Sequence, residues 1–382
     1  MDWLFNPLPK AGLDWVFGVV PTAESLKTYK YRSPNLSLFE RLFLDDFWGW
    51  LPGHVYPAWL APNAITCAGL GAIAGMTALV LRTSPDLAGA APRWVYGVCG
   101  ASVWLYQTLD GSDGKQARAT KSGSALGEVM DHGVDALATV LITVSSMDMA
   151  AFGASSWCTW TPVLTSCAGF YLSNMVLIHK GRQDFQEVDI QEMLCGIQVA
   201  FGIGAWRGAG FFRRALPLGL TPRWLFVVAG SGGSVANCAM YVASVSKTDK
   251  PAHLRPQFLA LGAFLGAAAF NVATLGGSSV APFVLAATAA FGDVSRRLLH
   301  QRVGVPPGAW LTAPTVLLLA LPAAPERARW RVALAAAGLA FVGAARSARA
   351  MADALGVDVF TTRRRPPPPP ASPEAWRTKK RS

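Results

Sequence analysis

Charged residues are scarce in this chain of 382 residues. Only 15% of the residues are charged and 52% are hydrophobic, whereas an ordinary soluble domain carries about 25% charged residues. A soluble protein of this length usually divides into two or three domains joined by polar linkers. Here, apolar stretches of roughly membrane-spanning length recur from Trp59 almost to Ala345. The composition therefore disfavours a soluble protein and indicates one polytopic membrane domain.

Two further features are missing. The six cysteines form no C-x-x-C pair, so we expect neither a disulfide framework nor a zinc site. The first 58 residues hold no basic segment followed by an apolar core, so we expect no cleavable signal peptide and the first span to act as the insertion signal.

Basic residues, by contrast, are plentiful. The formal net charge is +11, but Lys and Arg stand singly or in pairs between the apolar runs. This pattern is typical of loops that are anchored at a membrane surface. We therefore expect contact with the lipid bilayer and no nucleic-acid partner.

Ten ranges of the chain approach the length of about 20 mainly apolar residues that a membrane-spanning helix needs. We predict an all-α fold, a polytopic integral membrane helical bundle with about ten transmembrane helices. The fifth and ninth ranges are short. The predicted spans lie near residues 59–81, 92–110, 125–147, 157–178, 190–206, 223–245, 256–274, 280–298, 309–323 and 330–346.

The basic residues also indicate an orientation. An even number of spans places both termini on one side, and most of the 34 Lys and Arg residues fall in the tails and the even-numbered loops. Because basic loops stay on the cytoplasmic side, we predict that both termini are cytoplasmic. The fifth loop is an exception, with Arg207, Arg213, Arg214 and Arg223.

The flanking segments complete the predicted domain organisation. We predict that residues 1–58 form a cytoplasmic segment, 59–346 the transmembrane domain, and 347–382 a basic, proline-rich cytoplasmic tail. We expect the last 20 or so residues of this tail to be disordered. Residues 36–51 have apolar side chains at helical spacing and two tryptophans, Trp48 and Trp50, suited to an interface. This segment is either an amphipathic helix on the cytoplasmic membrane face or a short helix packed on the bundle without lipid contact.

Four aspartates lie in one short stretch between the second and third spans. Asp110 and Asp113 are three residues apart and share one helix face. Asp131 and Asp135 are four apart and share a face about two turns into the third span. Burying even one isolated carboxylate at membrane depth is costly, and like charges raise the cost. The sequence therefore predicts a positive group between the four carboxylates.

Divalent cations with oxygen ligands fit these carboxylates best. Four carboxylates suit Mg²⁺ or Mn²⁺, and we expect two ions bridged by an aspartate. Gly111, Gly114 and Gly127 have no side chains and leave room for a bulky ligand near the metals. Arg118 and Lys115 stand one to two turns past the second aspartate, where they can hold a pyrophosphate. The stretch thus predicts a site for an anionic, metal-chelating substrate.

This stretch resembles the signature of the CDP-alcohol phosphotransferase family. All eight fixed positions match, in the form Asp110-x2-Asp113-Gly114-x2-Ala117-Arg118-x8-Gly127-x3-Asp131-x3-Asp135. Other segments resemble the eukaryotic choline and ethanolamine phosphotransferase branch. They are LKTYKYRS (26–33), WLAPNAIT (59–66), DGKQAR (113–118), GEVMDHGVD (127–135) and ALGVDVF (354–360). The resemblance covers roughly residues 26 to 360. The branch's usual asparagine-glycine-proline stretch after the fourth span has no clear match here, so the resemblance does not indicate which headgroup the enzyme prefers.

The resemblance implies an activity and a location. It implies transfer of phosphoethanolamine or phosphocholine from CDP-ethanolamine or CDP-choline to 1,2-diacylglycerol, with release of CMP. The product is then phosphatidylethanolamine or phosphatidylcholine. Asp110, Asp113, Asp131 and Asp135 would hold the metals, and the family implies a homodimer. A lipid substrate and a cytoplasmic nucleotide imply a membrane of the endoplasmic reticulum or Golgi, with the active site facing the cytoplasm.

The acceptor hydroxyl needs a proton acceptor, because an alcohol is a poor nucleophile at neutral pH. The family resemblance nominates Asp135, but a carboxylate bound to metal is a weak base. Imidazole is a better base near neutral pH, and His132 lies four residues after Glu128, on the same face. We hypothesise that His132, oriented by Glu128, is the general base, with Asp135 as the alternative.

Three residues near the aspartates have two interpretations each. Asn63, which follows Pro62 early in the first span, forms a hydrogen bond either to the nucleotide or to a neighbouring helix. Trp104 and Tyr106 precede the first aspartate. They are either part of a cation–π site for choline or ordinary lipid-facing or core aromatics.

Other functions remain open from the sequence. A cation-coupled transporter also has carboxylates in the membrane, but its sites usually lie at the midplane on broken helices. A catalytically silent scaffold should lack at least one signature residue, and none is missing. A CDP-diacylglycerol-dependent phosphatidyltransferase is a further alternative within the family. The resemblance disfavours it, because the motifs WLAPN and DHG and a count of ten rather than about six spans are unlike such enzymes.

Overall fold

The computed structural model describes residues 10–26, 29, 36–181, 190–216, 219–248, 251–275 and 279–362. Within these residues the regular secondary structure is helical, apart from one isolated β-bridge between Leu60 and Thr361. The prediction of an all-α fold is therefore confirmed. Most of the LKTYKYRS segment and residues 363–382 of the predicted tail lie outside the described part of the chain.

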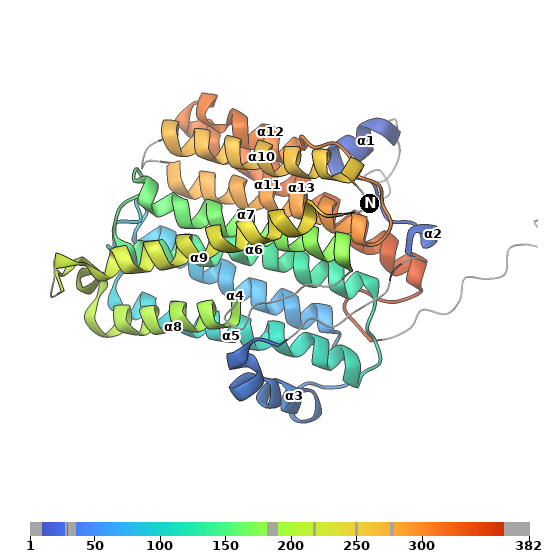
Figure 1. Cartoon of the computed structure of the whole chain (residues 1–382), viewed down its shortest axis with the longest axis horizontal. Coiled ribbons are helices and arrows are strands. Elements are labelled where there is room, and N and C mark those ends of the chain that lie inside the picture. The colour runs from blue at the N-terminus through green and yellow to red at the C-terminus, as the bar shows by residue number, and fades with distance from the viewer. Residues whose placement is uncertain are drawn as a thin grey trace, which may run out of the picture.

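Each of the ten predicted spans contains a helix, and these helices run side by side along the long axis of the molecule (Figure 1). The helices are α4 (Pro62–Thr83), α5 (Arg93–Ala119), α6 (Ala125–Ala150), α7 (Trp157–Lys180), α8 (Ile190–Arg207), α9 (Pro222–Val245), α10 (Pro251–Leu275), α11 (Val280–Arg302), α12 (Ala313–Ala320) and α13 (Glu326–Leu355). Short 3₁₀ turns follow α8 (Ala209–Arg213) and α12 (Leu321–Ala323).

Six helices in the described ranges are long and apolar enough to cross a membrane, namely α4, α6, α7, α9, α10 and α13. The chain is thus a polytopic integral membrane protein, as predicted. The predicted count of ten spans exceeds these six for physical reasons. Helices α5 and α11 carry clusters of charged side chains, α8 has only 18 residues, and α12 has eight. The short fifth and ninth ranges are therefore confirmed as short helices.

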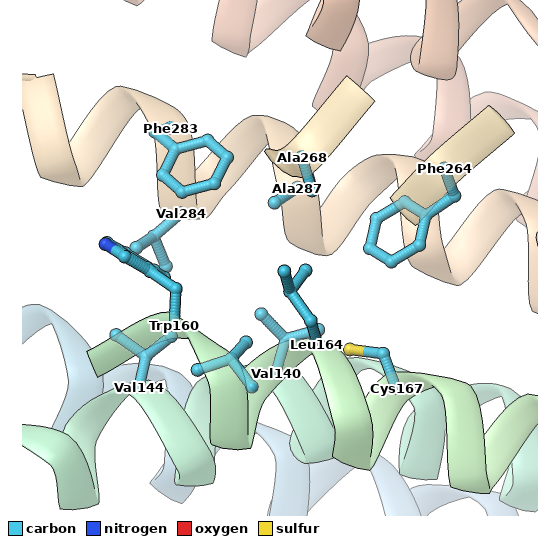
Figure 2. Close-up of a pocket in the computed structure, with 11 residues that line it drawn as sticks. Val140, Val144, Trp160, Leu164, Cys167, Phe264, Ala268, Phe283, Val284 and Ala287 are labelled. Carbon is cyan, nitrogen blue, oxygen red and sulfur yellow. The ribbon is translucent and has the colours of Figure 1, made fainter. Parts of the chain in front are cut away.

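The bundle core is closely packed. A small gap of about 10 Å³ lies between α6, α7, α10 and α11, lined by apolar side chains that include Val140, Trp160, Cys167 and Phe264 (Figure 2). A single water molecule needs roughly 10–15 Å³, so this gap is too small for a substrate. The six cysteines are all free, in agreement with the absence of paired spacing.

Three helical segments precede the bundle. They are α1 (Lys10–Phe17), α2 (Ala23–Leu26), and a π-helical turn at Glu40–Leu44 that continues into α3 (Asp45–His54). Helix α3 packs against α5 (Figure 1). Trp50 is half exposed, but Trp48 is only 1% exposed, so the prediction that both tryptophans face an interface is wrong for Trp48.

The two ends of the described chain are tied into the bundle. The last four carbonyls of α1, from Asp14 to Phe17, accept hydrogen bonds from Arg296 and Arg297 of α11, at 2.7–3.3 Å. The Asp14 carbonyl also accepts a hydrogen bond from the Gly18 amide at 2.9 Å. A helix end offers no such internal partners to its last carbonyls, and the two guanidinium groups supply donors for those of residues 15–17. Both arginines also pair with Asp293, at 2.5 and 2.8 Å.

At the other end, residues 356–362 cross the start of α4, and we call them the C-terminal strap. Thr361 forms the β-bridge with Leu60, and the Thr362 hydroxyl donates to the carbonyl of Ala58 at 3.0 Å. The carbonyl of Val359 accepts a hydrogen bond from the Asn63 amide at 2.8 Å. The WLAPN and ALGVDVF segments, far apart in sequence, are therefore neighbours.

Candidate metal and phosphate site

The site lies where α5 ends and α6 begins. The connection from Thr120 to Ser124 is tight, with Lys121 at a positive φ of 54°. Ser124 then caps α6, because its hydroxyl accepts a hydrogen bond from the Gly127 amide at 3.2 Å. This turn brings the carboxylates of the two helices to the same end of the bundle.

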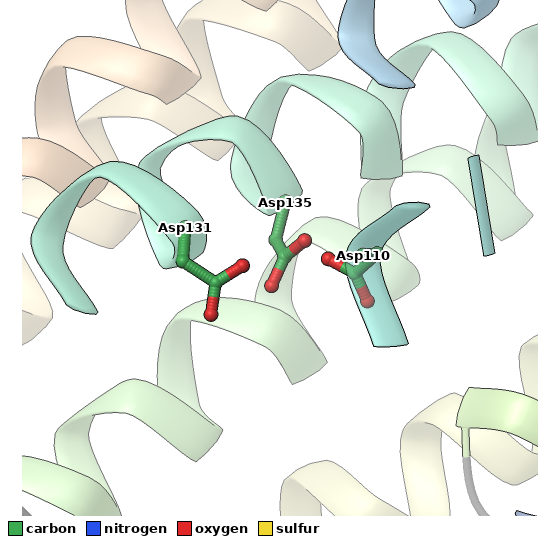
Figure 3. Close-up of side chains that lie close together, drawn as sticks. All are labelled: Asp110, Asp131 and Asp135. Carbon is green, nitrogen blue, oxygen red and sulfur yellow. The ribbon is translucent and has the colours of Figure 1, made fainter. Parts of the chain in front are cut away.

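Three of the four predicted metal ligands converge. Asp110 of α5 and Asp131 and Asp135 of α6 each offer one oxygen, and these oxygens lie within 4.8 Å of one another. Figure 3 shows the three carboxylates turned toward a common space. Oδ1 of Asp131 is buried and has no hydrogen-bond partner among the described residues. An oxygen-only donor set with an unpartnered buried carboxylate atom fits a hard divalent cation.

Asp113, the fourth predicted ligand, lies beside this group but is not part of it. It is 6% exposed, and its Oδ2 accepts a hydrogen bond from the Thr66 hydroxyl of α4. Thr66 sits one turn after Asn63, in the WLAPNAIT segment, so that segment supplies a direct contact to the signature. The sequence analysis did not identify Thr66 as a site residue, because an isolated threonine in a span carries no recognisable signal.

A tyrosine holds the last aspartate of the signature. The Tyr106 hydroxyl donates to Oδ1 of Asp135 at 2.5 Å, and the ring is 5% exposed. Trp104 is half exposed, with its ring centroid 6.5 Å from that of Phe47. The two side chains therefore do not form one cage for a quaternary ammonium group, and the interpretation of Tyr106 as a core aromatic fits the structure.

The two predicted phosphate-binding cations occupy different positions. Lys115 forms an ion pair with Asp45 of α3, and its contact with phosphate stays a prediction. Arg118 is exposed and folds back over Gly114, where an added Cβ would lie 3.7 Å from its Nη1. Arg118 is thus the cation that remains available for an anionic ligand.

The three signature-region glycines also differ in what they accommodate. At Gly111 an added Cβ would lie 2.5 Å from Cδ2 of Trp48, so the missing side chain makes room for the ring of Trp48 rather than for a ligand. At Gly127 the nearest atoms would be Oδ1 of Asn63 and Oγ of Ser124, each at 3.8 Å. Gly114 and Gly127 therefore have only ordinary contacts around an added Cβ, whereas Gly111 is needed for helix packing.

The predicted pair of His132 and Glu128 is not formed. Oε1 of Glu128 lies 3.2 Å from Nε of Arg302 in α11, and both side chains are about nine-tenths buried. Nδ1 of His132 is buried and has no hydrogen-bond partner among the described residues. The (i, i+4) spacing placed the two residues on one face, but the buried guanidinium is the stronger partner for the carboxylate.

Tyr56 stands outside the spans and braces the same end of α5. Its hydroxyl lies 2.7 Å from Oγ of Ser112, which itself donates to the carbonyl of Thr108 at 2.6 Å. Burial raises the pKa of Tyr56, so its hydroxyl stays protonated and can donate to Ser112. This contact fixes the entry to α4 against the helix that carries Asp110 and Asp113.

Comparison with known proteins supports the sequence resemblance. Residues 59–205 match the family model described as CDP-alcohol phosphatidyltransferase. Cholinephosphotransferase 1 of Homo sapiens is 33% identical over 221 residues, which cover 56% of this chain and 53% of the human protein. Cholinephosphotransferase 1 of Gallus gallus is 34% identical over 218 residues, covering 56% and 64% of the two chains.

A fungal relative matches over a shorter range. Choline/ethanolaminephosphotransferase 1 of Saccharomyces cerevisiae is 42% identical over 118 residues, covering 31% of this chain and 30% of the yeast protein. The chain thus spans about half the length of the human relative and less of the yeast one. The resemblance to the choline and ethanolamine branch is confirmed over the matched region, which contains the whole signature.

Proposed function

We propose that this chain, whose residues 59–205 match the CDP-alcohol phosphatidyltransferase family model, transfers phosphocholine or phosphoethanolamine from a CDP-alcohol to 1,2-diacylglycerol and releases CMP. The observation that carries the proposal is the convergence of Asp110, Asp131 and Asp135 at one end of the bundle. Relatives named as cholinephosphotransferase and choline/ethanolaminephosphotransferase support the substrate class.

Asp110, Asp131 and Asp135 would hold Mg²⁺ or Mn²⁺, with Asp113 close enough to join a second ion. Bound there, the cations would supply the positive charge that neutralises a pyrophosphate and stabilises the leaving CMP. Three clustered carboxylates at membrane depth repel one another strongly, so the same cations also stabilise the fold. Thr66 holds Asp113 from α4 and keeps that carboxylate turned toward the site.

Arg118, exposed at the end of α5, would bind the phosphate oxygens. Its guanidinium can pair with two oxygens at once. Lys115 is engaged with Asp45 and would help indirectly, by holding α3 against α5. Asn63 connects the strap to the space beside Gly127, and its Oδ1 faces the place where we expect the nucleotide.

For the proton of the acceptor hydroxyl we favour His132 over Asp135. Oδ1 of Asp135 already accepts a hydrogen bond from Tyr106, whereas Nδ1 of His132 is buried and unpaired within the described residues. Glu128 is paired with Arg302, so its role would be to fix the first turns of α6 rather than to touch the imidazole. His132→Ala should reduce turnover by at least 100-fold, the contribution typical of general-base catalysis, while Mn²⁺ binding is kept. Near-normal turnover in this variant would exclude His132 as the base.

The overall activity is tested with the purified full-length protein in nanodiscs that contain diacylglycerol. We expect CMP release from CDP-choline or CDP-ethanolamine that requires Mg²⁺ or Mn²⁺ and is abolished in Asp131→Asn. Parallel reactions with each CDP-alcohol establish the headgroup. Activity with CDP-diacylglycerol and a soluble alcohol instead, or no CMP release at all, would contradict the proposal.

The protein is expected in the endoplasmic reticulum or Golgi membrane, with the site and both termini facing the cytoplasm and with two copies per assembly. The exposed Arg118 at the end of α5, which would bind an anionic nucleotide, supports this orientation. Protease protection of a C-terminal tag in sealed microsomes would contradict it.

A further inference from the structure

Two tyrosine–aspartate hydrogen bonds connect α5 to α6. Near the carboxylate cluster, the Tyr106 hydroxyl donates to Oδ1 of Asp135 at 2.5 Å. At the other end of the same two helices, the Tyr96 hydroxyl donates to Oδ2 of Asp148 at 2.7 Å. All four residues lie in the interior of the bundle, and the pairs are chemically alike. They differ in what else surrounds the aspartate.

Asp148 is a structural carboxylate. It is fully buried, and its Oδ1 accepts hydrogen bonds from the Ser84 hydroxyl at 2.6 Å and from the Gly89 amide at 2.8 Å. With the Tyr96 hydroxyl these donors satisfy both oxygens. The Asp148 network thus joins the loop after α4 to α5 and α6, and it leaves no oxygen to bind a ligand.

Asp135 stands in a different environment. One of its oxygens lies within 4.8 Å of an oxygen of Asp110 and of one of Asp131 (Figure 3). Since carboxylates that share a cation must keep a fixed rotation, the hydroxyl that holds Oδ1 determines how the group meets the other two. Partners of this kind orient metal ligands, and their loss typically costs 10–100-fold in metal affinity.

The hydroxyl of Tyr106 is itself fixed by packing. Its ring lies against Gly69 of α4, where an added Cβ would be 3.3 Å from Cδ2 of the tyrosine. The ring is 5% exposed, so it cannot swing out toward lipid or solvent. The position of the donor is therefore set by α4 and α5, independently of the aspartate on α6.

We propose that Tyr106 is a positioning residue for the carboxylate cluster, and that its hydroxyl holds Asp135 in the rotation in which Asp110, Asp131 and Asp135 bind one divalent cation. The inference rests on the proposed function in one respect, namely that this cation is the one that supports the transfer reaction. It assigns to the tyrosine before the signature a role in metal affinity rather than in headgroup recognition.

The chain offers a matched control. Tyr106→Phe and Tyr96→Phe each remove one hydroxyl that donates to an aspartate between the same two helices. We expect both variants to lose thermal stability. Only Tyr106→Phe should weaken Mn²⁺ binding, by 10–100-fold, whereas Tyr96→Phe should stay within about twofold of the wild type. Mn²⁺ binding is measured by electron paramagnetic resonance on the full-length protein in nanodiscs, without nucleotide.

A second variant allows the inference to be tested even if Tyr106→Phe does not fold. Gly69→Ala retains the hydroxyl but pushes on the Tyr106 ring, so it should weaken Mn²⁺ binding in the same direction and by a smaller factor. In the transfer reaction, Tyr106→Phe should raise the Mn²⁺ concentration for half-maximal rate and leave the KM for the CDP-alcohol nearly unchanged. Unaltered Mn²⁺ affinity in Tyr106→Phe, or an equal loss in Tyr96→Phe, would overturn the inference.

The two proposals fail in different ways. A wild-type protein that binds Mn²⁺ but releases no CMP from either CDP-alcohol would contradict the proposed function, and the binding comparison between the two tyrosine variants would still stand. A wild-type protein that binds no Mn²⁺ would refute the positioning role directly.

Discussion

Single side chains decide how α3 meets the signature helix. Gly111 lies under the ring of Trp48, and an added Cβ would overlap that ring at 2.5 Å from its Cδ2. Contacts below 3.0 Å force one partner to move, and both the ring and the helix backbone are rigid. Gly111, at a variable position between the first two aspartates of the signature, thus serves a packing contact that is formed only when α3 is docked.

We therefore predict that Gly111→Ala displaces Trp48 and loosens α3. The variant should be destabilised by about 1–3 kcal/mol, the usual cost of overpacking, and its tryptophan fluorescence should shift toward that of an exposed indole. Gly75→Ala is the control, because nothing lies within 4 Å of an added Cβ there, and replacing an open helical glycine is neutral or stabilising. Equal thermal stability of the two variants would contradict this account.

The same residues mark what sequence could and could not predict. The spacing of Asp110, Asp131 and Asp135 placed them on facing helix surfaces, because (i, i+3) and (i, i+4) positions share a face whatever the rest of the chain does. The partners Thr66, Trp48 and Arg302 could not be predicted, since each comes from a helix far along the chain. Side-chain pairing across helices depends on how the helices pack, and periodicity does not carry that information.

At the level of helices, the spans were predictable where the hydrophobic stretch is continuous. They were less predictable where charged side chains interrupt that stretch. Helices α5 and α11 fall below the apolarity of a typical span because they carry the signature aspartates and the cluster of Asp293, Arg296 and Arg297. The α11 cluster is paired within itself, which reduces the cost of its burial. The sequence analysis still located both helices, because their apolar halves remain.

The contact between the C-terminal strap and α4 can be tested by mutation. Asn63→Ala removes the amide that donates to the carbonyl of Val359. Since one hydrogen bond is worth about 1 kcal/mol, amide hydrogen exchange in residues 356–362 should become about fivefold faster. Asn174→Ala is the control, because that buried amide donates to the Phe170 carbonyl in its own helix. Unchanged exchange in the strap of Asn63→Ala would show that other contacts hold it.

For the whole molecule, the pair of Glu128 and Arg302 joins the matched region of residues 59–205 to α11, which lies beyond it. Arg302 also donates to the carbonyl of Gly181 at 3.3 Å, so one guanidinium contacts α6 and the end of α7. The second half of the bundle is in this way attached directly to the helix that carries Asp131 and Asp135.

A double-mutant cycle measures this attachment. Glu128→Gln and Arg302→Met should each cost about 3–5 kcal/mol, because each leaves a buried charge without its partner. The double variant should lose clearly less than the sum of the two. Denaturant unfolding of the protein in detergent gives the three values, and strictly additive losses would mean that the two side chains do not interact energetically.

The arginines that cap α1 have a consequence for biosynthesis. Arg296 and Arg297, which bind the carbonyls of residues 14–17, are added about 280 residues after them. At about 5–20 residues per second, a ribosome needs tens of seconds to cover that distance. During this time the carbonyls of residues 15–17 lack the two guanidinium groups that bind them in the complete fold. The docking of α1 thus waits until α11 has been made, and a chain truncated before α11 would keep these three carbonyls without their arginine donors.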